Sequence, residues 1–289
     1  MEWIFKTMSN EKKQMIKKKS WSDLVPRLLS ALVLLPLTAL VLYFGGIWFA
    51  ILVGAVFAGA YREWEIMVNV KKLSKQSFLI IALVALSAIV FPFTGAFGSL
   101  GIIAFACLIV LFSPSSNRLW RIGGLLFFAI VIIAILAMRG TQNLGIVAGV
   151  FMATCVWMTD TGAFFTGRLV GGAKLSPEIS PSKTWSGAFG GLIVGTLSGL
   201  LVWVVATDSP IWIGLLLGAT LSLSGQIGDL IESAIKRRFR VKDSSDLIPG
   251  HGGIMDRLDS LSIAVLVVFI VGFVHSGDIN NIASGFLIW

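Results

Sequence analysis

Residues 28–44 read LLSALVLLPLTALVLYF, an apolar run within a first candidate span near 26–44 that is long enough to cross a bilayer. Eight further runs of this kind follow near residues 46–64, 77–94, 97–113, 121–138, 144–166, 186–207, 210–235 and 258–275. With 56% hydrophobic and only 13% charged residues, the chain has too little polar surface to cover a soluble domain. We therefore expect an all-α polytopic membrane protein with about nine transmembrane helices.

The distribution of positive charge predicts how these spans are oriented. If the N-terminus is cytoplasmic and all nine runs cross, 22 of the 23 lysines and arginines lie on the cytoplasmic side, and only Arg139 lies outside. The C-terminus is then expected on the opposite side. The net charge of +8 is explained by these loop lysines and arginines, which set the orientation and attract anionic lipid. Since no nucleic-acid-binding motif accompanies it, we expect no nucleic-acid partner.

Ionisable residues are concentrated in residues 233–259, which read SAIKRRFRVKDSSDLIPGHGGIMDRLD. So many charges beside hydrocarbon indicate a function, and cations next to carboxylates suit a site that holds phosphates and a divalent metal. Asp256 and Asp259 share one helix face, and Asp229 and Glu232 repeat that spacing in the preceding span. The alternative for Asp256 and Asp259 is a solvated helix start, where the helix dipole stabilises acids.

Other candidate residues lie near the ends of the later spans. Asp160 lies in a run of Thr and Gly at the inner end of the sixth span, and a buried carboxylate there is costly unless it binds a metal, a substrate hydroxyl or a loop cation. Residues 174–187, KLSPEISPSKTWSG, resist helix formation because of their prolines. Lys183 and Thr184 then precede the seventh span, where they favour either bound phosphate or simple helix capping. His251 lies among glycines, which favours substrate contact. The first five spans carry few ionisable groups at depth and are expected to be scaffold.

The charged stretch resembles the signature of a known family. Residues 233–259 fit, at every defined position, the signature of the phosphatidate cytidylyltransferases, also called CDP-diacylglycerol synthases. The upstream stretches WxxDTGAFFxGR (157–168) and ISPxKTWxG (179–187) also resemble that family. The chain departs from the family at Ser182, Ser186 and Gly225, where members commonly have Lys, Glu and Ser.

The resemblance implies a nucleotidyltransferase of phospholipid biosynthesis in the cell (inner) membrane, with its active site on the cytoplasmic side. CTP and phosphatidic acid would give CDP-diacylglycerol and pyrophosphate, with Mg²⁺ and a second cation such as K⁺, and a homodimer is an open alternative for the assembly. The residues implied for catalysis are Asp229, Lys236, Arg237, His251, Asp256, Arg257 and Asp259, with Asp229, Asp256 and Asp259 at the metal. Those implied for substrate binding are Asp160, Lys183, Thr184, Lys242, Asp243, Gly252 and Gly253.

This interpretation divides the chain into three regions and leaves two alternatives open. The regions are a basic cytoplasmic N-terminal segment (1–25), a transmembrane scaffold (26–138) and a catalytic transmembrane region (139–289). A CTP-dependent polyprenol or lipid-alcohol kinase has a related layout but would release CDP, and the full signature argues against it. A transporter of an anionic solute would place ionisable groups near the midplane, often between repeats, whereas here they cluster at one face.

Overall fold

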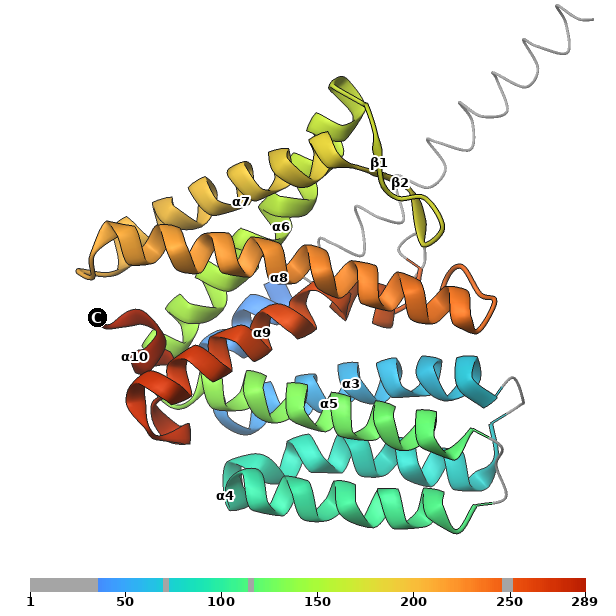
Figure 1. Cartoon of the computed structure of the whole chain (residues 1–289). Coiled ribbons are helices and arrows are strands. Elements are labelled where there is room, and N and C mark those ends of the chain that lie inside the picture. The colour runs from blue at the N-terminus through green and yellow to red at the C-terminus, as the bar shows by residue number, and fades with distance from the viewer. Residues whose placement is uncertain (1–35, 70–72, 114–116, 246–251) are drawn as a thin grey trace, which may run out of the picture.

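The computed structural model describes residues 36–69, 73–113, 117–245 and 252–289, which are almost entirely helical (Figure 1). Seven of the described helices are long and apolar enough to span a membrane, as the all-α polytopic prediction requires. Residues 36–44 are also helical and belong to the first predicted span, whose beginning lies outside the described residues. The elements that follow are α3 (Gly46–Asn69), α4 (Lys75–Leu111), α5 (Arg118–Arg139), α6 (Leu144–Leu169), β1 (Lys174–Ser176), β2 (Ser180–Thr184), α7 (Trp185–Ala206), α8 (Ile211–Arg238), α9 (Met255–Ser276), η1 (Ile279–Asn281) and α10 (Ile282–Leu287).

α4 consists of two helices that fold back on each other. Gly95, within it, has φ 63° and ψ −158°, a conformation that breaks the helix and favours glycine. The side-chain amide of Gln76 donates to the carbonyl of Ile109 at 3.0 Å, although a straight helix would separate these residues by about 50 Å. The two halves therefore correspond to the predicted spans 77–94 and 97–113, and Figure 1 shows them lying side by side.

A tight turn at Gly45 and Gly46 joins the helix of residues 36–44 to α3. Both glycines have positive φ, 62° and 52°, a backbone conformation that favours glycine in a tight turn. Arg139, at the end of α5, is buried against this turn: its Nε donates to the carbonyl of Leu42 at 2.6 Å, and Nη2 donates to that of Tyr43 at 3.0 Å. The one cation outside the predicted cytoplasmic segments thus satisfies helix-end carbonyls.

Small residues let α6 and α7 approach closely. Four buried glycines recur at every fourth position of α7 from Gly187 to Gly199. A Cβ on Gly191 would lie 2.7 Å from the carbonyl oxygen of Thr159, so this contact excludes larger residues. The hydroxyl of Thr159 also donates to Ser222 in α8 at 2.6 Å. These contacts fix α6, α7 and α8 relative to one another.

A buried polar network connects α3, α4 and α5. Glu65 and Arg121 form an ion pair with Nη2 2.7 Å from Oε1, and Nε donates to Oε2 at 3.0 Å. Ser77 and Asn69 donate to Oε1 of Glu65 as well, at 2.9 and 2.8 Å. Glu65, Arg121 and the fully buried Glu63 lie near the ends of α3 and α5, so the expectation of few ionisable groups at depth in this half stays a prediction. These charges are accommodated because the neighbouring helices supply their partners.

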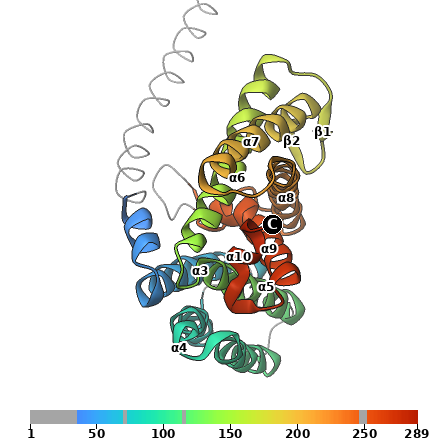
Figure 2. The same cartoon turned by 90° about the vertical axis from the view of Figure 1, so that its left-hand side faces the viewer.

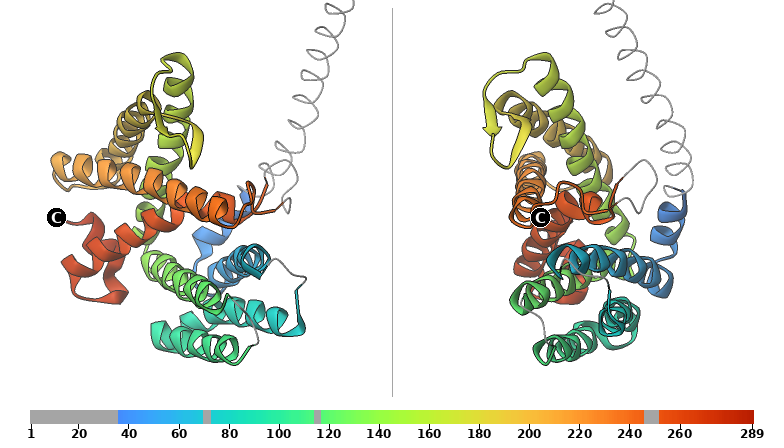
Figure 3. Two further views of the ribbon diagram at one scale, coloured as in Figure 1. Left: turned by 45° about the vertical axis from the view of Figure 1, so that its right-hand side comes forward. Right: turned by 90° about the vertical axis from the view of Figure 1, so that its right-hand side faces the viewer.

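The elements form three groups (Figures 2 and 3). α6, α7 and the antiparallel β1–β2 hairpin lie at one side, α8 and α9 lie in the middle, and α3, α4 and α5 lie at the other side. In the hairpin Lys174 pairs with Thr184 and Ser176 with Ser180, which agrees with the predicted resistance of this segment to helix formation. The charged side chains of the later segments meet between these groups.

Candidate active site

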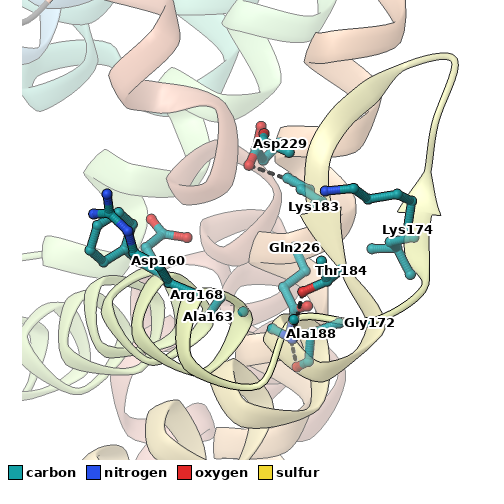
Figure 4. A pocket seen from close by; sticks show the side chains of 16 residues that line it. Asp160, Ala163, Arg168, Gly172, Lys174, Lys183, Thr184, Ala188, Gln226 and Asp229 are labelled. Atoms are coloured by element: carbon teal, nitrogen blue, oxygen red, sulfur yellow. Dashed lines mark hydrogen bonds and ion pairs between the residues drawn. The ribbon is translucent and has the colours of Figure 1, made fainter. Parts of the chain in front are cut away.

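A cavity of about 670 Å³ lies between α6, the hairpin, the start of α7 and α8 (Figure 4). α6 supplies Asp160 and Arg168 to its lining, the hairpin supplies Lys174 and Lys183, and α8 supplies Asp229. The hairpin folds back over α8, and this brings cations and carboxylates from distant parts of the sequence into one space. Such a mixed lining suits an anionic ligand that arrives with a cation.

Lys183 and Asp229 form an ion pair in this cavity. Nζ of Lys183 lies 2.5 Å from Oδ2 of Asp229, and the two side chains are 24% and 32% exposed. A partly solvated pair of this kind contributes little to stability. Two of the predicted site residues are therefore brought together where a ligand can reach both of them.

Thr184 caps α7. Its Oγ1 accepts a hydrogen bond from the backbone N–H of Gly187 at 3.1 Å, and its side chain is buried. The helix-capping interpretation is therefore confirmed for Thr184, whereas a contact with substrate stays a prediction. Ser182, where the chain departs from the family pattern, is exposed and lines the cavity. Ser186, another departure, donates to the carbonyl of Gly171 at 2.5 Å.

Asp160 lies on the cavity wall with its side chain exposed. The expectation of a buried carboxylate is wrong, because the neighbouring Thr159 is the residue that packs against α7 and α8. Arg168 lies two turns further along α6, with its guanidinium 5.4 Å from the ring centre of Phe164, and lines the same cavity. The sequence interpretation did not assign Arg168 a role, although its spacing from Asp160 places both on one helix face.

A second charged cluster connects the end of α8 to the start of α9. Nζ of Lys236 lies 2.7 Å from Oδ1 of Asp256 and 3.5 Å from Oε1 of Glu232. Oδ2 of Asp256 accepts hydrogen bonds from the backbone N–H and hydroxyl of Ser244, at 3.1 and 2.9 Å, and from the N–H of Gly253 at 3.1 Å. Asp256 lies in the first turn of α9, where the sequence predicted it, and is held from several sides.

Glu232 is a buried carboxylate with unused capacity to accept hydrogen bonds. Within the described residues neither of its oxygens has a donor in hydrogen-bonding geometry, and its charged neighbours include Lys236, Asp256 and Asp259. Two adjacent carboxylates of this kind fit Mg²⁺, which usually takes one or two protein carboxylates together with substrate phosphates. No three His, Cys, Asp or Glu side chains in the described part of the chain are grouped closely enough to hold a metal alone. Substrate oxygens would therefore have to complete the coordination.

A second cavity of about 290 Å³ lies on the other side of α8, between α3, α5, α8 and α9. Its lining is apolar and aromatic apart from Glu232, Asp259 and Ser262. α8 separates the two cavities, because Gln226 and Asp229 line the first, whereas Gly228 and Glu232 line the second. The further lining residues of the second cavity are Trp64, Trp120, Gly123, Phe127, Phe128, Ile231, Ile235, Met255, Leu258 and Ile263.

Arg237 connects α8 to the hairpin. Its Nε donates to the carbonyl of Ile179 at 3.3 Å, and Nη1 donates to that of Val241 at 3.1 Å. These contacts hold the hairpin over the end of α8. The predicted role of Arg237 in catalysis stays a prediction.

The remaining predicted residues differ in their contacts and in their exposure to solvent. Gly252 has a φ of 79°, which favours glycine, and Gly253 contacts Asp256. His251 lies outside the described residues, so its substrate contact stays a prediction. Three others are exposed: Lys242, Asp243 and Arg257.

Known proteins resemble this chain along most of its length. A model of the cytidylyltransferase family matches residues 25–275. A protein of Brucella suis biovar 1 named phosphatidate cytidylyltransferase is 34% identical over 257 residues, which cover 88% of this chain and 95% of that protein. One of the same name from Staphylococcus epidermidis is 38% identical over 199 residues, covering 68% of this chain and 67% of that protein. The chain belongs to the cytidylyltransferase family.

Proposed function

We propose that this protein is an enzyme that transfers the cytidylyl group of CTP to phosphatidic acid, forming CDP-diacylglycerol and releasing pyrophosphate. The observation that carries this proposal is the similarity to relatives named phosphatidate cytidylyltransferase, which extends over 88% of this chain. Two neighbouring cavities, one charged and one apolar, support it, because the two substrates are a nucleotide polyanion and a lipid.

We assign CTP to the larger cavity. Its volume of about 670 Å³ is within the range of small-molecule sites, and Arg168, Lys174 and Lys183 supply cations for a triphosphate. Hydrogen bonds between such cations and phosphate oxygens are among the stronger polar contacts in proteins. An arriving phosphate would compete with Asp229 for Lys183, and this exchange would leave the carboxylate available to a cation.

We assign the acyl chains of phosphatidic acid to the smaller cavity. Its aromatic and aliphatic lining suits hydrocarbon, and Glu232 and Asp259 mark its polar part. A lipid bound there would carry its phosphate to Glu232 and Asp259, and Glu232 lies one helical turn from Asp229, which lines the nucleotide cavity. The cluster of Lys236 and Asp256 lies next to this position and supplies the cation for the lipid phosphate.

The transfer needs positioning and charge neutralisation more than proton removal. A phosphate oxygen of phosphatidic acid is already anionic and would attack the α-phosphorus of CTP in line, while the bond to the bridging oxygen breaks and pyrophosphate leaves. Lys183 and Lys236 would hold the phosphates of CTP and phosphatidic acid close together and offset the repulsion between them. Mg²⁺ would be held largely by substrate phosphates, with Asp229, Asp256 and Asp259 as its predicted protein contacts and Glu232 beside Asp259 as a further carboxylate. Together with a second cation such as K⁺, it would neutralise charge on the leaving pyrophosphate.

We further propose nine spans, a cytoplasmic N-terminus, a C-terminus on the opposite side, and an active site open to the cytoplasm. The hairpin and the C-terminal end of α8 lie toward one end of the molecule, and the C-terminus and α10 lie toward the other (Figure 1). The bacterial relatives support a location in the cell (inner) membrane. A homodimer stays a prediction, which the mass of the detergent-solubilised protein would test.

The deciding experiment incubates the purified full chain in detergent with labelled CTP, phosphatidic acid and Mg²⁺, with and without EDTA. We expect labelled CDP-diacylglycerol and pyrophosphate, and no product when EDTA is present. Release of CDP upon addition of a lipid alcohol would instead indicate the kinase. Intact CTP in the presence of folded protein would reject the proposed reaction and lead to transport assays.

A further inference from the structure

Glu63, in the half of the chain expected to be scaffold, contacts the beginning of α9. Its side chain is fully buried, and both of its oxygens accept two hydrogen bonds. Oε1 accepts from the N–H of Ile254 at 2.9 Å and from the hydroxyl of Ser245. Oε2 accepts from the N–H of Met255 at 2.8 Å and from the hydroxyl of Ser244 at 3.0 Å. The acceptor capacity of this carboxylate is therefore filled by one short region of the chain.

These contacts place a negative charge at the positive end of α9. The first N–H groups of a helix have no partner within the helix, and the N-cap residue of α9, Ile254, offers no side-chain cap. Glu63 supplies the missing acceptor from another helix, in an orientation that the helix dipole favours. α3 also passes close to Ile254 one turn earlier, at Gly59, where a Cβ would collide with the Ile254 side chain.

Ser244, which contacts Glu63, also contacts Asp256. The hydroxyl of Ser244 lies 3.0 Å from Oε2 of Glu63 and 2.9 Å from Oδ2 of Asp256, so the two carboxylates share one donor. A Cβ on Gly253 would lie 2.8 Å from Oε2 of Glu63 and 3.0 Å from Oδ2 of Asp256. Asp256 in turn lies 2.7 Å from Lys236. A shift of the Glu63 carboxylate would therefore displace the charged pair of the site.

We propose that Glu63 is a positioning residue for the reaction. It fixes the first turn of α9 and Ser244, and through them the orientations of Asp256 and Asp259 relative to Lys236. The inference rests on the proposed function, because it assumes that these carboxylates take part in nucleotidyl transfer. It gives the N-terminal half a direct part in the geometry of the site.

Glu65 provides a matched control for a purely structural role. It lies two residues further along α3, is equally buried, and pairs with Arg121 of α5 instead of α9. Glu63→Gln replaces one acceptor oxygen of Glu63 by a donor group that faces two donors. Glu65→Gln perturbs a buried carboxylate of the same helix without touching the start of α9.

The test compares Glu63→Gln, Glu63→Asp and Glu65→Gln in the full-length enzyme. We expect Glu63→Gln to lower kcat by about 10- to 100-fold, the loss typical when a group that orients metal ligands is changed. KM for CTP should change little. Glu63→Asp keeps the charge and should recover part of kcat, whereas Glu65→Gln should lower thermal stability and leave kcat per folded molecule unchanged. Amide hydrogen exchange of residues 252–258 should accelerate in Glu63→Gln and not in Glu65→Gln.

Two results would overturn the inference. One is an unchanged kcat in Glu63→Gln, and the other is an equal loss of kcat in both Gln variants at equal loss of stability. If Glu63→Gln does not fold, the kcat and exchange of Glu63→Asp decide in the same way. A wild-type enzyme that forms no CDP-diacylglycerol would reject the proposed function instead, and the exchange measurement would still test the contact between Glu63 and α9.

Discussion

The polar network of the scaffold and the ion pairs of the candidate site use the same residue types under opposite conditions. Glu65 and Arg121 are 1% and 2% exposed, and Ser77, Asn69 and Ser113 give them further hydrogen bonds. Lys183 and Asp229 are 24% and 32% exposed and face a cavity. A buried ion pair whose hydrogen bonds are all made holds helices together, because separating its charges would leave each of them buried without a partner. A solvated pair can exchange its partner for a ligand at small cost.

The largest expected effect comes from removing a carboxylate of the site. Asp256→Asn or Asp259→Asn should lower turnover by at least about 100-fold, because each removes a charge placed to act in the transition state. The measurement is CDP-diacylglycerol formation by purified protein whose helical content and melting temperature are checked in parallel. Asp278→Asn is a suitable control, since the Asp278 carboxylate caps the short η1 helix and accepts hydrogen bonds from Asn280 and Asn281 near the C-terminus. Retained activity in both site variants would show that Asp256 and Asp259 neither bind the metal nor take part in catalysis.

The next effect tests the scaffold side of the comparison. Arg121→Met leaves Glu65 buried without its cation and should lower the free energy of unfolding by about 3–5 kcal/mol. Turnover per folded molecule should not change. Chemical denaturation in detergent, followed by circular dichroism, measures the loss, and the double variant Glu65→Leu with Arg121→Met should recover part of it. A variant with normal stability and reduced turnover would show that this network serves the site.

Lys183→Gln tests the solvated pair. The change should raise KM for CTP by about 10-fold, the loss expected for one charge-assisted hydrogen bond, and should barely alter the melting temperature. Initial rates at varied CTP concentration give KM, with phosphatidic acid saturating. An unchanged KM for CTP would place the nucleotide elsewhere than in the larger cavity.

The smallest effect sharpens the assignment of the apolar cavity. Gly123 lines it, and a Cβ there would meet no atom within 4 Å, so Gly123→Leu begins in open space and should occupy part of the cavity. We expect a higher KM for phosphatidic acid by several-fold, as for a change of about 1–3 kcal/mol in a hydrophobic pocket, and an unchanged KM for CTP. Gly101→Leu is the matched control, because Gly101 is equally open and lines neither substrate cavity. Equal effects of both variants would argue against a lipid site here.

Hydropathy predicted the helices well because each span must satisfy its own backbone in the membrane. It separated the runs 77–94 and 97–113 correctly, and the reversal at Gly95 lies between them. It could not find the pairing of Glu65 with Arg121, since these residues are 56 positions apart and the sequence placed Arg121 at a cytoplasmic boundary. Charge partners from different helices are set by packing, which no local pattern records.

The candidate site was predictable to the extent that its residues lie in contiguous motifs. Lys183, Asp229, Lys236 and Asp256 were all named, and the structure joins them into two ion pairs. Glu63 was missed because it lies outside the motifs that indicated the site, beside Arg62 and Glu65 in α3, nearly two hundred positions from the helix that it caps. Only the three-dimensional arrangement shows that its carboxylate and the N-terminus of α9 meet.

The crowding around Gly253 limits how this enzyme could be redesigned. Its hydrogen atoms occupy the space where any side chain would press on both Glu63 and Asp256. Diversification of the segment for altered substrate use should therefore keep Gly253 invariant and begin at the exposed Lys242 and Asp243. A library built in this way would vary exposed positions next to Ser244 while the charged centre of the site keeps its shape.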